Sequence, residues 1–407
     1  MRGVAMTRIN RNRLKVALST FWARIALVSL LAVNAHAAPA LYLNTNGSGW
    51  PLVRADGTVD SLCCQRVARY PTITLNVSPF ESRRPDVVRY LRLCNPRLRI
   101  MGYALVGASF PYFTPGSFWT EQWAQVADHL VRYPDGKPYP DALAPWPDWS
   151  DSALVRPASA LWCDRAVGSH LFDSVFLDYV GTHLWRSVPE DSARAANLGR
   201  LVAAIRSAGG PCFTVAGNGD AAGLQGTMFE GWPWLTYGTF RASFAALRAA
   251  PAGSWVKVET YAPVGSSEWN RAWRFALGCA ALVNGHGYAG PNRYVGPEGP
   301  GWPDEASVTP LVPGVSDGRT DTTGRYVSWL GELRSRGEVQ PDVWVGKFDH
   351  GLVVVNGSDT AVTVDLGAPL WREPFGRLAP TINAGRTVQR VSVGVQDARF
   401  YLARGKR

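Results

Sequence analysis

The chain has 407 residues, of which 46% are hydrophobic and 18% are charged, and its formal net charge at pH 7 is +10. A chain of this length and composition can bury a large core in one large domain with a small one, or in two to three domains, which excludes a disordered or fibrous protein. Residues 1–37 contain six of the basic residues and no acidic one, so the remaining residues carry a net charge of only +4. Because no basic run or nucleic-acid-binding motif follows residue 37, we expect no nucleic-acid partner.

Residues 1–37 are predicted to be a signal peptide. A basic region is followed by a short apolar core, Ile25–Val33, and by Ala35-x-Ala37, which fits the small-residue rule for cleavage. The apolar core is shorter than the roughly 20 residues that span a membrane. We therefore expect an exported protein, secreted or periplasmic, with no membrane span after signal removal. An uncleaved N-terminal anchor is the alternative.

The six cysteines of an exported protein are compatible with disulfides, and the sequence leaves many pairings open. Adjacent Cys63 and Cys64 are not expected to bond each other, and we expect one of them to pair with Cys94. The sequence shows no CxxC pair, no HExxH motif and no close His/Cys cluster. We therefore expect no metal site, and no cofactor.

From residue 38 onwards, short apolar strands alternate with stretches of helical spacing, which predicts a (β/α)8 TIM barrel, an α/β fold. An open doubly wound sheet is the alternative, but Asn46-Gly47-Ser48-Gly49-Trp50 is too short for its glycine-rich phosphate loop. The predicted helices include Pro85–Leu93, Ser192–Ser207, Tyr237–Ala249 and Glu268–Leu277. The predicted strands are Ala40–Asn44, Thr72–Asn76, Leu98–Tyr103, Asp173–Asp178, Cys212–Asn218, Thr227–Glu230, Trp255–Glu259 and Ala280–Asn284.

Polar side chains end the inward-facing half of most predicted strands. Along each strand, alternate residues face the helices and are apolar, and the other half ends in an amide or a carboxylate. Barrel enzymes keep their sites at this C-terminal mouth, and amides with carboxylates suit a polyhydroxylated ligand. The predicted ring consists of Asn44, Asn76, Asp178, Asn218, Glu230 and Glu259.

A long connection between the third and fourth strands, residues 106–171, is rich in aromatic residues and prolines, and long structured loops are usually functional. Trp119 and Trp123, four residues apart on a predicted helix, are expected to pack against the barrel. Trp146 and Trp149 are predicted to contact substrate, as are Tyr103 at the end of the third strand and Trp232 after the sixth. A second long loop, residues 296–324, is expected to flank the same opening.

The pattern of predicted strands and helices changes near residue 338. Tyr326–Arg336 is predicted to be a final helix that closes the barrel, after which strands without helices indicate a small antiparallel β domain. The predicted domains are a signal peptide over 1–37, a (β/α)8 catalytic domain over 38–338 and a β-sandwich-like domain over 339–407.

Three stretches carry a resemblance to a known family: Phe172-Asp173-Ser174-Val175-Phe176-Leu177-Asp178, Met228-Phe229-Glu230-Gly231-Trp232, and Gly351-Leu352-Val353-Val354-Val355-Asn356-Gly357-Ser358. In this order they resemble the glycoside hydrolase-like barrel family related to endo-α-1,4-polygalactosaminidases and α-galactosidases. The resemblance implies a nucleophile at the end of the fourth strand, Asp178, and an acid/base at the end of the sixth, Glu230. Tyr179 departs from the asparagine that relatives often carry there.

Cleavage of a glycosidic bond needs one carboxylate and one carboxylic acid. We expect an exported glycoside hydrolase that acts on a poly- or oligosaccharide by a retaining mechanism, with Glu230 next to Trp232 and Trp234. Glu259 is the alternative acid, or it pairs with Lys257 on the same strand face. The alternative function is a non-catalytic carbohydrate-binding or surface-assembly protein. The sugar, its linkage and the oligomeric state stay open.

Overall fold

We describe the structure for most of the chain after residue 39, in a computed structural model. The described residues are 40–44, 52–54, 56–68, 72–77, 84–107, 118–133, 135–138, 145–181, 192–233, 239–251, 254–258, 262, 266–283, 285–289, 330–367, 371–373, 381–382 and 384–403. The predicted signal peptide, the 296–324 loop, Trp234 and Glu259 lie outside them.

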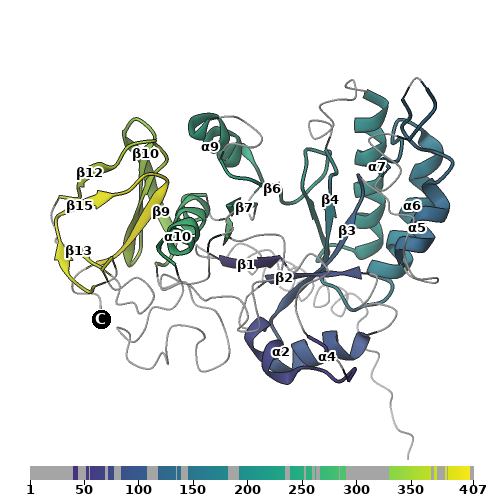
Figure 1. The fold of residues 1–407 in the computed structure, drawn as a ribbon, viewed down its shortest axis with the longest axis horizontal. Coiled ribbons are helices and arrows are strands. Elements are labelled where there is room, and N and C mark those ends of the chain that lie inside the picture. The colour runs from purple at the N-terminus through teal and green to yellow at the C-terminus, as the bar shows by residue number, and fades with distance from the viewer. Residues whose placement is uncertain are drawn as a thin grey trace, which may run out of the picture. The chain divides into compact units, whose positions relative to one another are not determined.

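Eight strands form one sheet, shown in Figure 1, and every hydrogen-bonded pair within it is parallel. The strand order is β5-β4-β3-β2-β1-β8-β7-β6. Strands that follow one another in the chain are therefore neighbours in the sheet, except β5 and β6 at its two ends, and β1 also pairs with β8. Gly217 in β5 also forms a parallel bridge with Thr227, which directly precedes β6. The strands are β1 Ala40–Asn44, β2 Thr72–Asn76, β3 Arg99–Leu105, β4 Ser174–Asp178, β5 Thr214–Gly217, β6 Met228–Phe229, β7 Trp255–Val258 and β8 His286–Ala289.

The first seven predicted strands are confirmed, with boundaries that differ by two residues or fewer. The eighth prediction, Ala280–Asn284, is wrong: helix α10, Ser267–Ala281, includes its first residues, and β8 begins at His286. The run Ala280-Ala281-Leu282-Val283 is apolar because α10 is buried on nearly all sides, and a short apolar run does not distinguish a buried strand from a buried helix.

Helices lie between most of the strands, where the sequence predicts them. Helix α4 is typical: Pro85 begins it, Asp86 occupies its first turn, and Val87, Val88 and Leu91 form its buried face. The described helices are α2 Ser61–Val67, α4 Pro85–Cys94, α5 Phe118–Val126, the 3-10 helix η1 Ser152–Leu154, α6 Val155–Trp162, the π-helix η2 Cys163–Val167, α7 Ser192–Gly209, α9 Phe240–Ala249 and α10. No described helix is long and apolar enough to cross a bilayer.

The region after residue 330 is built from antiparallel strands. One six-stranded sheet has the order β14-β13-β16-β11-β10-β9, and β12 pairs with β15 in a two-stranded sheet. The predicted helix Tyr326–Arg336 is wrong from Leu333 onwards, because those residues form β9 and pair with β10. The strands are β9 Leu333–Gln340, β10 Val343–Phe348, β11 Gly351–Asn356, β12 Val362–Asp365, β13 Trp371–Arg372, β14 Thr387–Val388, β15 Arg390–Val393 and β16 Asp397–Ala403.

Strand β11 divides its side chains between two hydrophobic cores. Val353 and Val355 join the core that contains the parallel sheet, whereas Leu352 and Val354 join a smaller core with β12 and β15. This alternation follows from the two-residue period of a strand. The six-stranded sheet therefore packs on both faces.

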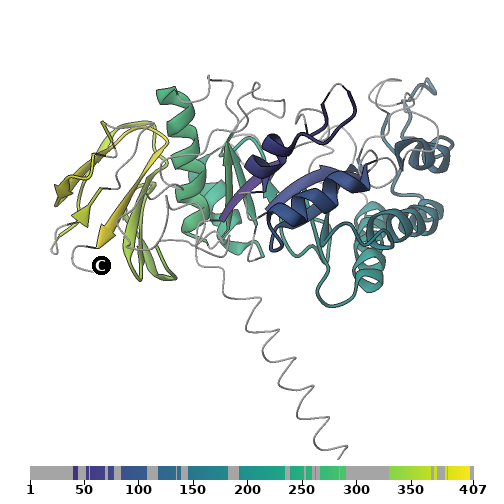
Figure 2. The same cartoon turned by 90° about the horizontal axis from the view of Figure 1, so that it is seen from below.

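Helix α10 lies along this sheet in both views (Figures 1 and 2). Arg274 makes a bidentate ion pair with Asp397, with Nε–Oδ1 and Nη2–Oδ2 distances of 2.8 and 2.9 Å, and both side chains are buried. A Cβ at Gly278 would lie 2.5 Å from the Cβ of Ala398, so the glycine permits the close approach. The contact between α10 and β16 is thus both ionic and closely packed.

Candidate active site

The five described residues of the predicted ring lie at the C-terminal ends of their strands, and the sixth, Glu259, lies outside the described residues. Asn44, Asn76 and Asp178 are the last residues of β1, β2 and β4, and Asn218 and Glu230 directly follow β5 and β6. Parallel strands bring these ends to one edge of the sheet. Contacts between side chains are described for three of them, Asp178, Asn218 and Glu230.

Asp178 ends a strand whose five residues are all buried, and only 6% of its own surface is exposed. Its Oδ1 accepts hydrogen bonds from the backbone N–H of Tyr179 at 3.0 Å and from Asn218 Nδ2 at 3.1 Å. Its Oδ2 is 2.7 Å from the hydroxyl of Tyr103. The structure places the Tyr103 hydroxyl against Asp178, and the predicted contact of Tyr103 with substrate stays a prediction.

Asn218 connects the two predicted catalytic carboxyl groups. Its Nδ2 donates to Asp178 Oδ1 at 3.1 Å and to Glu230 Oε2 at 2.8 Å, which uses both amide hydrogens. These two oxygens are therefore at most about 6 Å apart. The backbone of Asn218 is fixed to β4, since its N–H donates to Leu177 O and its carbonyl accepts from Val180 N–H.

Gly219 permits this close approach of the two strand ends. A Cβ at Gly219 would lie 2.4 Å from the backbone nitrogen of Gly181. No side chain fits there without moving the β4 end away from the β5 end.

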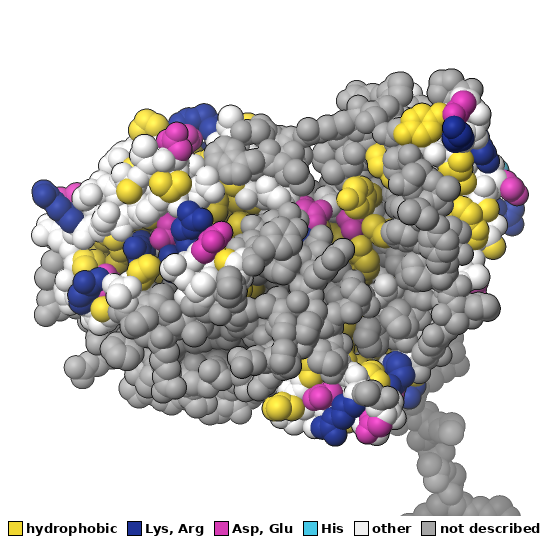
Figure 3. Space-filling view, viewed as in Figure 1, with side chains coloured by type: hydrophobic (Ala, Val, Ile, Leu, Met, Phe, Trp, Pro, Cys, Tyr) yellow, Lys and Arg dark blue, Asp and Glu magenta, His cyan; other side chains and the backbone are white. Residues whose placement is uncertain are grey.

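Glu230 forms an ion pair with Lys257, whose Nζ contacts Oε1. The Lys257 side chain is 1% exposed and that of Glu230 is 16% exposed. Acidic side chains are visible in Figure 3 in the part of the surface that lies over β4 and β6 in Figure 1. Glu230 is thus a partner of Lys257, while the predicted alternative partner, Glu259, lies outside the described residues.

Lys257 was not predicted as a site residue. The signal that could have found it is the alternation in β7, where Val256 and Val258 face the helices and leave Lys257 facing inward. A buried lysine needs an acceptor or a negative charge, and Glu230 was already predicted at the same opening.

Burial raises the pKa of Asp178 to about 6, and the negative charge of Glu230 adds to this increase. The hydrogen bonds from Tyr103 and Asn218 and the charge of Lys257 act in the opposite direction. Burial, together with the charge of Asp178, also raises the pKa of Tyr103 well above its usual value. Tyr103 is therefore a neutral hydroxyl group at any physiological pH.

Aromatic rings surround the base of the carboxyl pair. Phe176, two residues before Asp178, stacks on Tyr103 with ring centroids 6.0 Å apart and meets Trp255 edge to face at 6.1 Å. These apolar neighbours exclude water, which is the physical cause of the raised pKa of Asp178.

Three predicted substrate contacts need correction or remain proposals. Trp149 is 1% exposed and donates its indole N–H to Val106 O at 2.9 Å, so it is a core residue and we withdraw it from the substrate-binding set. Trp232 is also buried, between Phe229 and Phe240, and we withdraw it for the same reason. Trp146 is half-buried and packs against the core.

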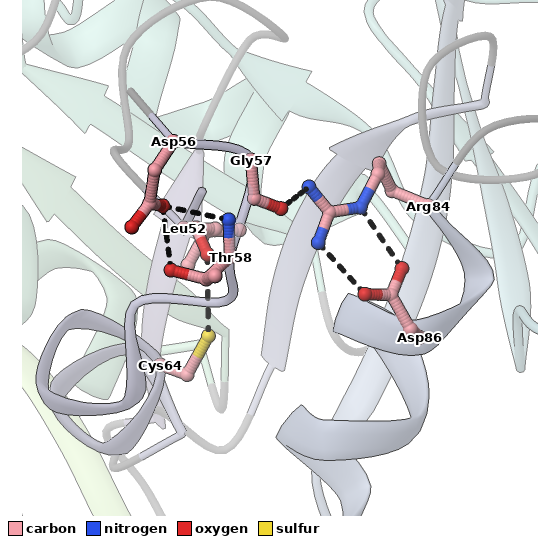
Figure 4. Close-up of polar contacts among 7 residues, drawn as sticks. All are labelled: Leu52, Asp56, Gly57, Thr58, Cys64, Arg84 and Asp86. Carbon is pink, nitrogen blue, oxygen red and sulfur yellow. Dashed lines mark hydrogen bonds and ion pairs between the residues drawn. The ribbon is translucent and has the colours of Figure 1, made fainter. Parts of the chain in front are cut away.

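The cysteines are all thiols in this structure, so the predicted pair of Cys94 with Cys63 or Cys64 is not formed. Burial raises the pKa of Cys64 to about 12, and its thiol points at Leu52 O (Figure 4). In the same region Arg84 pairs with Asp86 and donates to Gly57 O at 2.8 Å, which ties α4 to the segment after β1. Among the described residues, no group of three or more His, Cys, Asp or Glu side chains could hold a metal ion.

No protein-family model and no curated protein sequence matches the chain. Among solved structures, an inactive double mutant of MutB in complex with isomaltulose matches with a TM-score of 0.51 and 12% identity, over 89% of this chain and 98% of that one. The α-glucosyl transfer enzyme XgtA matches with a TM-score of 0.48 and 11% identity, over 91% and 100%. The galactosidase domain of the α-galactosidase-sucrose kinase AgaSK matches with a TM-score of 0.48 and 12% identity, over 90% of this chain and 54% of that one. The likeness to MutB shows a shared fold.

Proposed function

We propose that the parallel sheet closes on itself as a (β/α)8 barrel. The pairing of β1 with β8 and the bridge from Gly217 to Thr227 support closure, because they join both sides of the sheet. The Gly217 N–H also donates to Gly226 O at 3.1 Å across the same gap between β5 and β6. A barrel would place the strand ends that carry the carboxyl pair around one mouth.

We propose that the protein is an exported glycoside hydrolase that cleaves a poly- or oligosaccharide with Asp178 and Glu230. The observation that carries the proposal is the shared Asn218 amide, which holds one oxygen of each carboxyl group within about 6 Å of the other. Retaining glycosidases keep their two carboxyl groups about 5 to 5.5 Å apart, whereas inverting ones keep them about 6.5 to 9.5 Å apart. The separation favours a retaining mechanism.

In that mechanism one carboxylate attacks the anomeric carbon while the other carboxyl group gives its proton to the leaving oxygen. Water then attacks the glycosyl-enzyme bond, its proton returns to the second group, and the first carboxylate is released. Strand order in the resembling family implies attack by Asp178 and proton transfer by Glu230. The ring amides, Asn44 and Asn76 among them, would bind sugar hydroxyls.

The test is hydrolysis of amino-sugar, galactose-containing and glucose-containing oligo- and polysaccharides by the chain from residue 38. On any cleaved substrate, Asp178→Asn and Glu230→Gln should each reduce kcat by about a thousandfold or more. Asp359→Asn, at an exposed turn, is the matched control and should keep full activity. The first product should retain the anomeric configuration. Full turnover in both site variants would contradict the proposal.

A non-catalytic carbohydrate-binding protein is the second candidate, and Tyr179 favours it. This residue stands where relatives often carry asparagine, adopts a left-handed backbone with φ of 58°, and exposes 38% of its surface beside Asp178. Saturable binding of an oligosaccharide without release of reducing ends would support this function. Reducing-end release that Asp178→Asn abolishes would exclude it.

A further inference from the structure

Tyr179, the residue after Asp178, has a backbone conformation that an aromatic residue rarely adopts. Its φ is 58°, in the left-handed region where glycine and asparagine are the usual residues. A conformation of this kind costs free energy, persists only where the surrounding structure fixes it, and is found mostly at functional sites. The strain therefore indicates that the side chain at this position has a function.

Hydrogen bonds on both sides of Tyr179 hold it in this conformation. On one side the carbonyl of Asp178 accepts from the N–H of Val106 at 2.8 Å, and on the other side the N–H of Val180 donates to Asn218 O at 2.9 Å. The Tyr179 N–H itself donates to Asp178 Oδ1 at 3.0 Å. The turn that carries the tyrosine is therefore attached to the ends of β3 and β5 and to the carboxyl pair.

The Tyr179 side chain lies beside the end of β3 and is partly open to solvent. A Cβ at Gly107 would lie 2.3 Å from Tyr179 Cβ, so the glycine provides the space that this side chain needs, and 38% of the Tyr179 surface is exposed. Burial and the charge of Asp178 are the main causes of the raised pKa of Tyr103, and the Tyr179 phenol adds to it, which places that phenol near the site. In Figure 3, hydrophobic side chains, a class that includes tyrosine, adjoin the acidic side chains over β4 and β6.

We propose that the Tyr179 ring binds carbohydrate, by stacking on the apolar C–H face of a sugar ring whose oxygen atoms reach the carboxyl pair. The carboxyl groups and the Asn218 amide offer polar partners beside the ring, and a sugar needs both kinds of surface because its hydroxyl edge is polar and its C–H face is not. A tyrosine ring also loses little conformational entropy on binding, because few of its bonds rotate. The proposal rests on the carbohydrate ligand of the proposed function, which the hydrolase and the non-catalytic candidate share.

Two substitutions separate the Tyr179 ring from the turn that carries it. Asparagine adopts a left-handed φ more readily than tyrosine, so Tyr179→Asn should keep the N–H that donates to Asp178 and lose the ring. Tyr179→Phe keeps the ring and loses the hydroxyl. Comparison of the two variants therefore assigns an effect on binding to the ring or to the hydroxyl.

The test is binding of maltotetraose, stachyose and an α-1,4-linked galactosamine tetrasaccharide to the chain from residue 38, measured by isothermal titration calorimetry. For any tetrasaccharide that is cleaved, all variants also carry Asp178→Asn, so that binding is measured without turnover. Tyr179→Asn should weaken binding by about tenfold or more, whereas Tyr179→Phe should stay within about twofold of wild type. Tyr133→Asn removes a tyrosine that is 41% exposed between α5 and η1 and, as the matched control, should leave the affinity unchanged.

A second measurement reads the ring contact directly and does not depend on the folding of Tyr179→Asn. With ¹³C-labelled tyrosine in the protein, the C–H protons of the bound tetrasaccharide should show a nuclear Overhauser contact to a tyrosine ring, and Tyr179→Phe should abolish that contact. Equal affinity of wild type and Tyr179→Asn, absence of the Tyr179 contact, or binding of none of these tetrasaccharides by wild type would overturn the proposal.

The rate of hydrolysis keeps this proposal distinct from the proposed hydrolase function. If wild type binds a tetrasaccharide through Tyr179 and does not cleave it, the hydrolase function fails and the stacking contact stands. If a tetrasaccharide is cleaved and Tyr179→Asn leaves both KM and kcat at their wild-type values, the stacking contact fails and the hydrolase function stands.

Discussion

Ionisation of the Asp178 carboxyl group has an energetic cost in the folded protein, which its neighbours reduce but do not remove. Apolar rings and the charge of Glu230 oppose ionisation, while Tyr103, Asn218 and Lys257 favour it. The net effect is a carboxyl group whose pKa in the folded protein is about 6, compared with about 3.9 in an unfolded chain. The folded protein therefore binds this proton more tightly than the unfolded chain does.

This difference predicts a pH-dependent gain in stability for Asp178→Asn. Below about pH 4 the group is protonated in both states and has no effect, whereas above about pH 6 ionised Asp178 lowers the free energy of unfolding. Asparagine stays neutral and can donate its amide to the Tyr103 oxygen. The stability difference between variant and wild type should therefore increase by about 1 to 3 kcal/mol from pH 4 to pH 7.5.

Denaturant unfolding at both pH values measures this difference. Asp359→Asn is the control, because a pH effect on the stability of the whole protein is the same in both variants and cancels when their free energies of unfolding are compared. A difference that shrinks as the pH rises would show that Asp178 is not destabilised by its surroundings.

At the residue scale, the sequence predicts positions better than partners. Strand alternation located Asp178, Asn218 and Glu230 because a strand has a fixed two-residue period. It did not predict that Lys257 pairs with Glu230, since that contact depends on how two neighbouring strands align. Trp149 was misassigned because a tryptophan in a long loop can equally be a core residue.

At the scale of elements, α10 shows why the eighth strand was misplaced. A helix that contacts one core has an apolar stripe with a 3.6-residue period, but α10 is covered by β7 and β8 on one side and by β11 and β16 on the other. The α10 sequence therefore lacks the polar face that would distinguish a helix from a buried strand. The charged β9 was misassigned for the opposite reason, since an exposed strand has few apolar residues to show its period.

The close packing of α10 on β16 predicts that Gly278→Ala is destabilising. Alanine normally favours a helix over glycine by about 1 kcal/mol, but this Cβ would be 2.5 Å from Ala398 Cβ and 2.9 Å from Val355 Cγ2. Overpacking costs about 1 to 3 kcal/mol, so the free energy of unfolding should fall by about 1 to 2 kcal/mol.

Gly199→Ala in α7 is the matched control, measured by the same denaturant unfolding. Its nearest neighbour would be Ala222 Cβ at 3.4 Å, an ordinary contact, and the helix propensity of alanine should stabilise it by up to about 1 kcal/mol. Equal effects of the two substitutions would show that α10 does not need a glycine at this position.

At the scale of the whole molecule, the N-terminal segment predicts export. Expressed from Met1 in a bacterium, the protein should appear in the periplasm or medium with Ala38 as its first residue, because cleavage follows Ala37. Intact-mass measurement and N-terminal sequencing provide the test. Removal of residues 1–37 leaves every described strand and helix intact, since β1 begins at Ala40.

Ala37→Lys should block this cleavage, whereas Ala5→Lys, which adds a charge to the basic region, should not. An uncleaved chain recovered from the membrane fraction with wild-type sequence would favour the N-terminal anchor.

The contact between Arg274 and Asp397 has a consequence for how the protein is made. The two residues are 123 positions apart in the chain, so α10 emerges from the ribosome long before the strand that covers it. Until then its outer face has no partner, and such long-range contacts form slowly. A nascent chain in this condition cannot complete its core during synthesis, and in the proposed exported protein this would keep the chain loosely folded until it crosses the membrane.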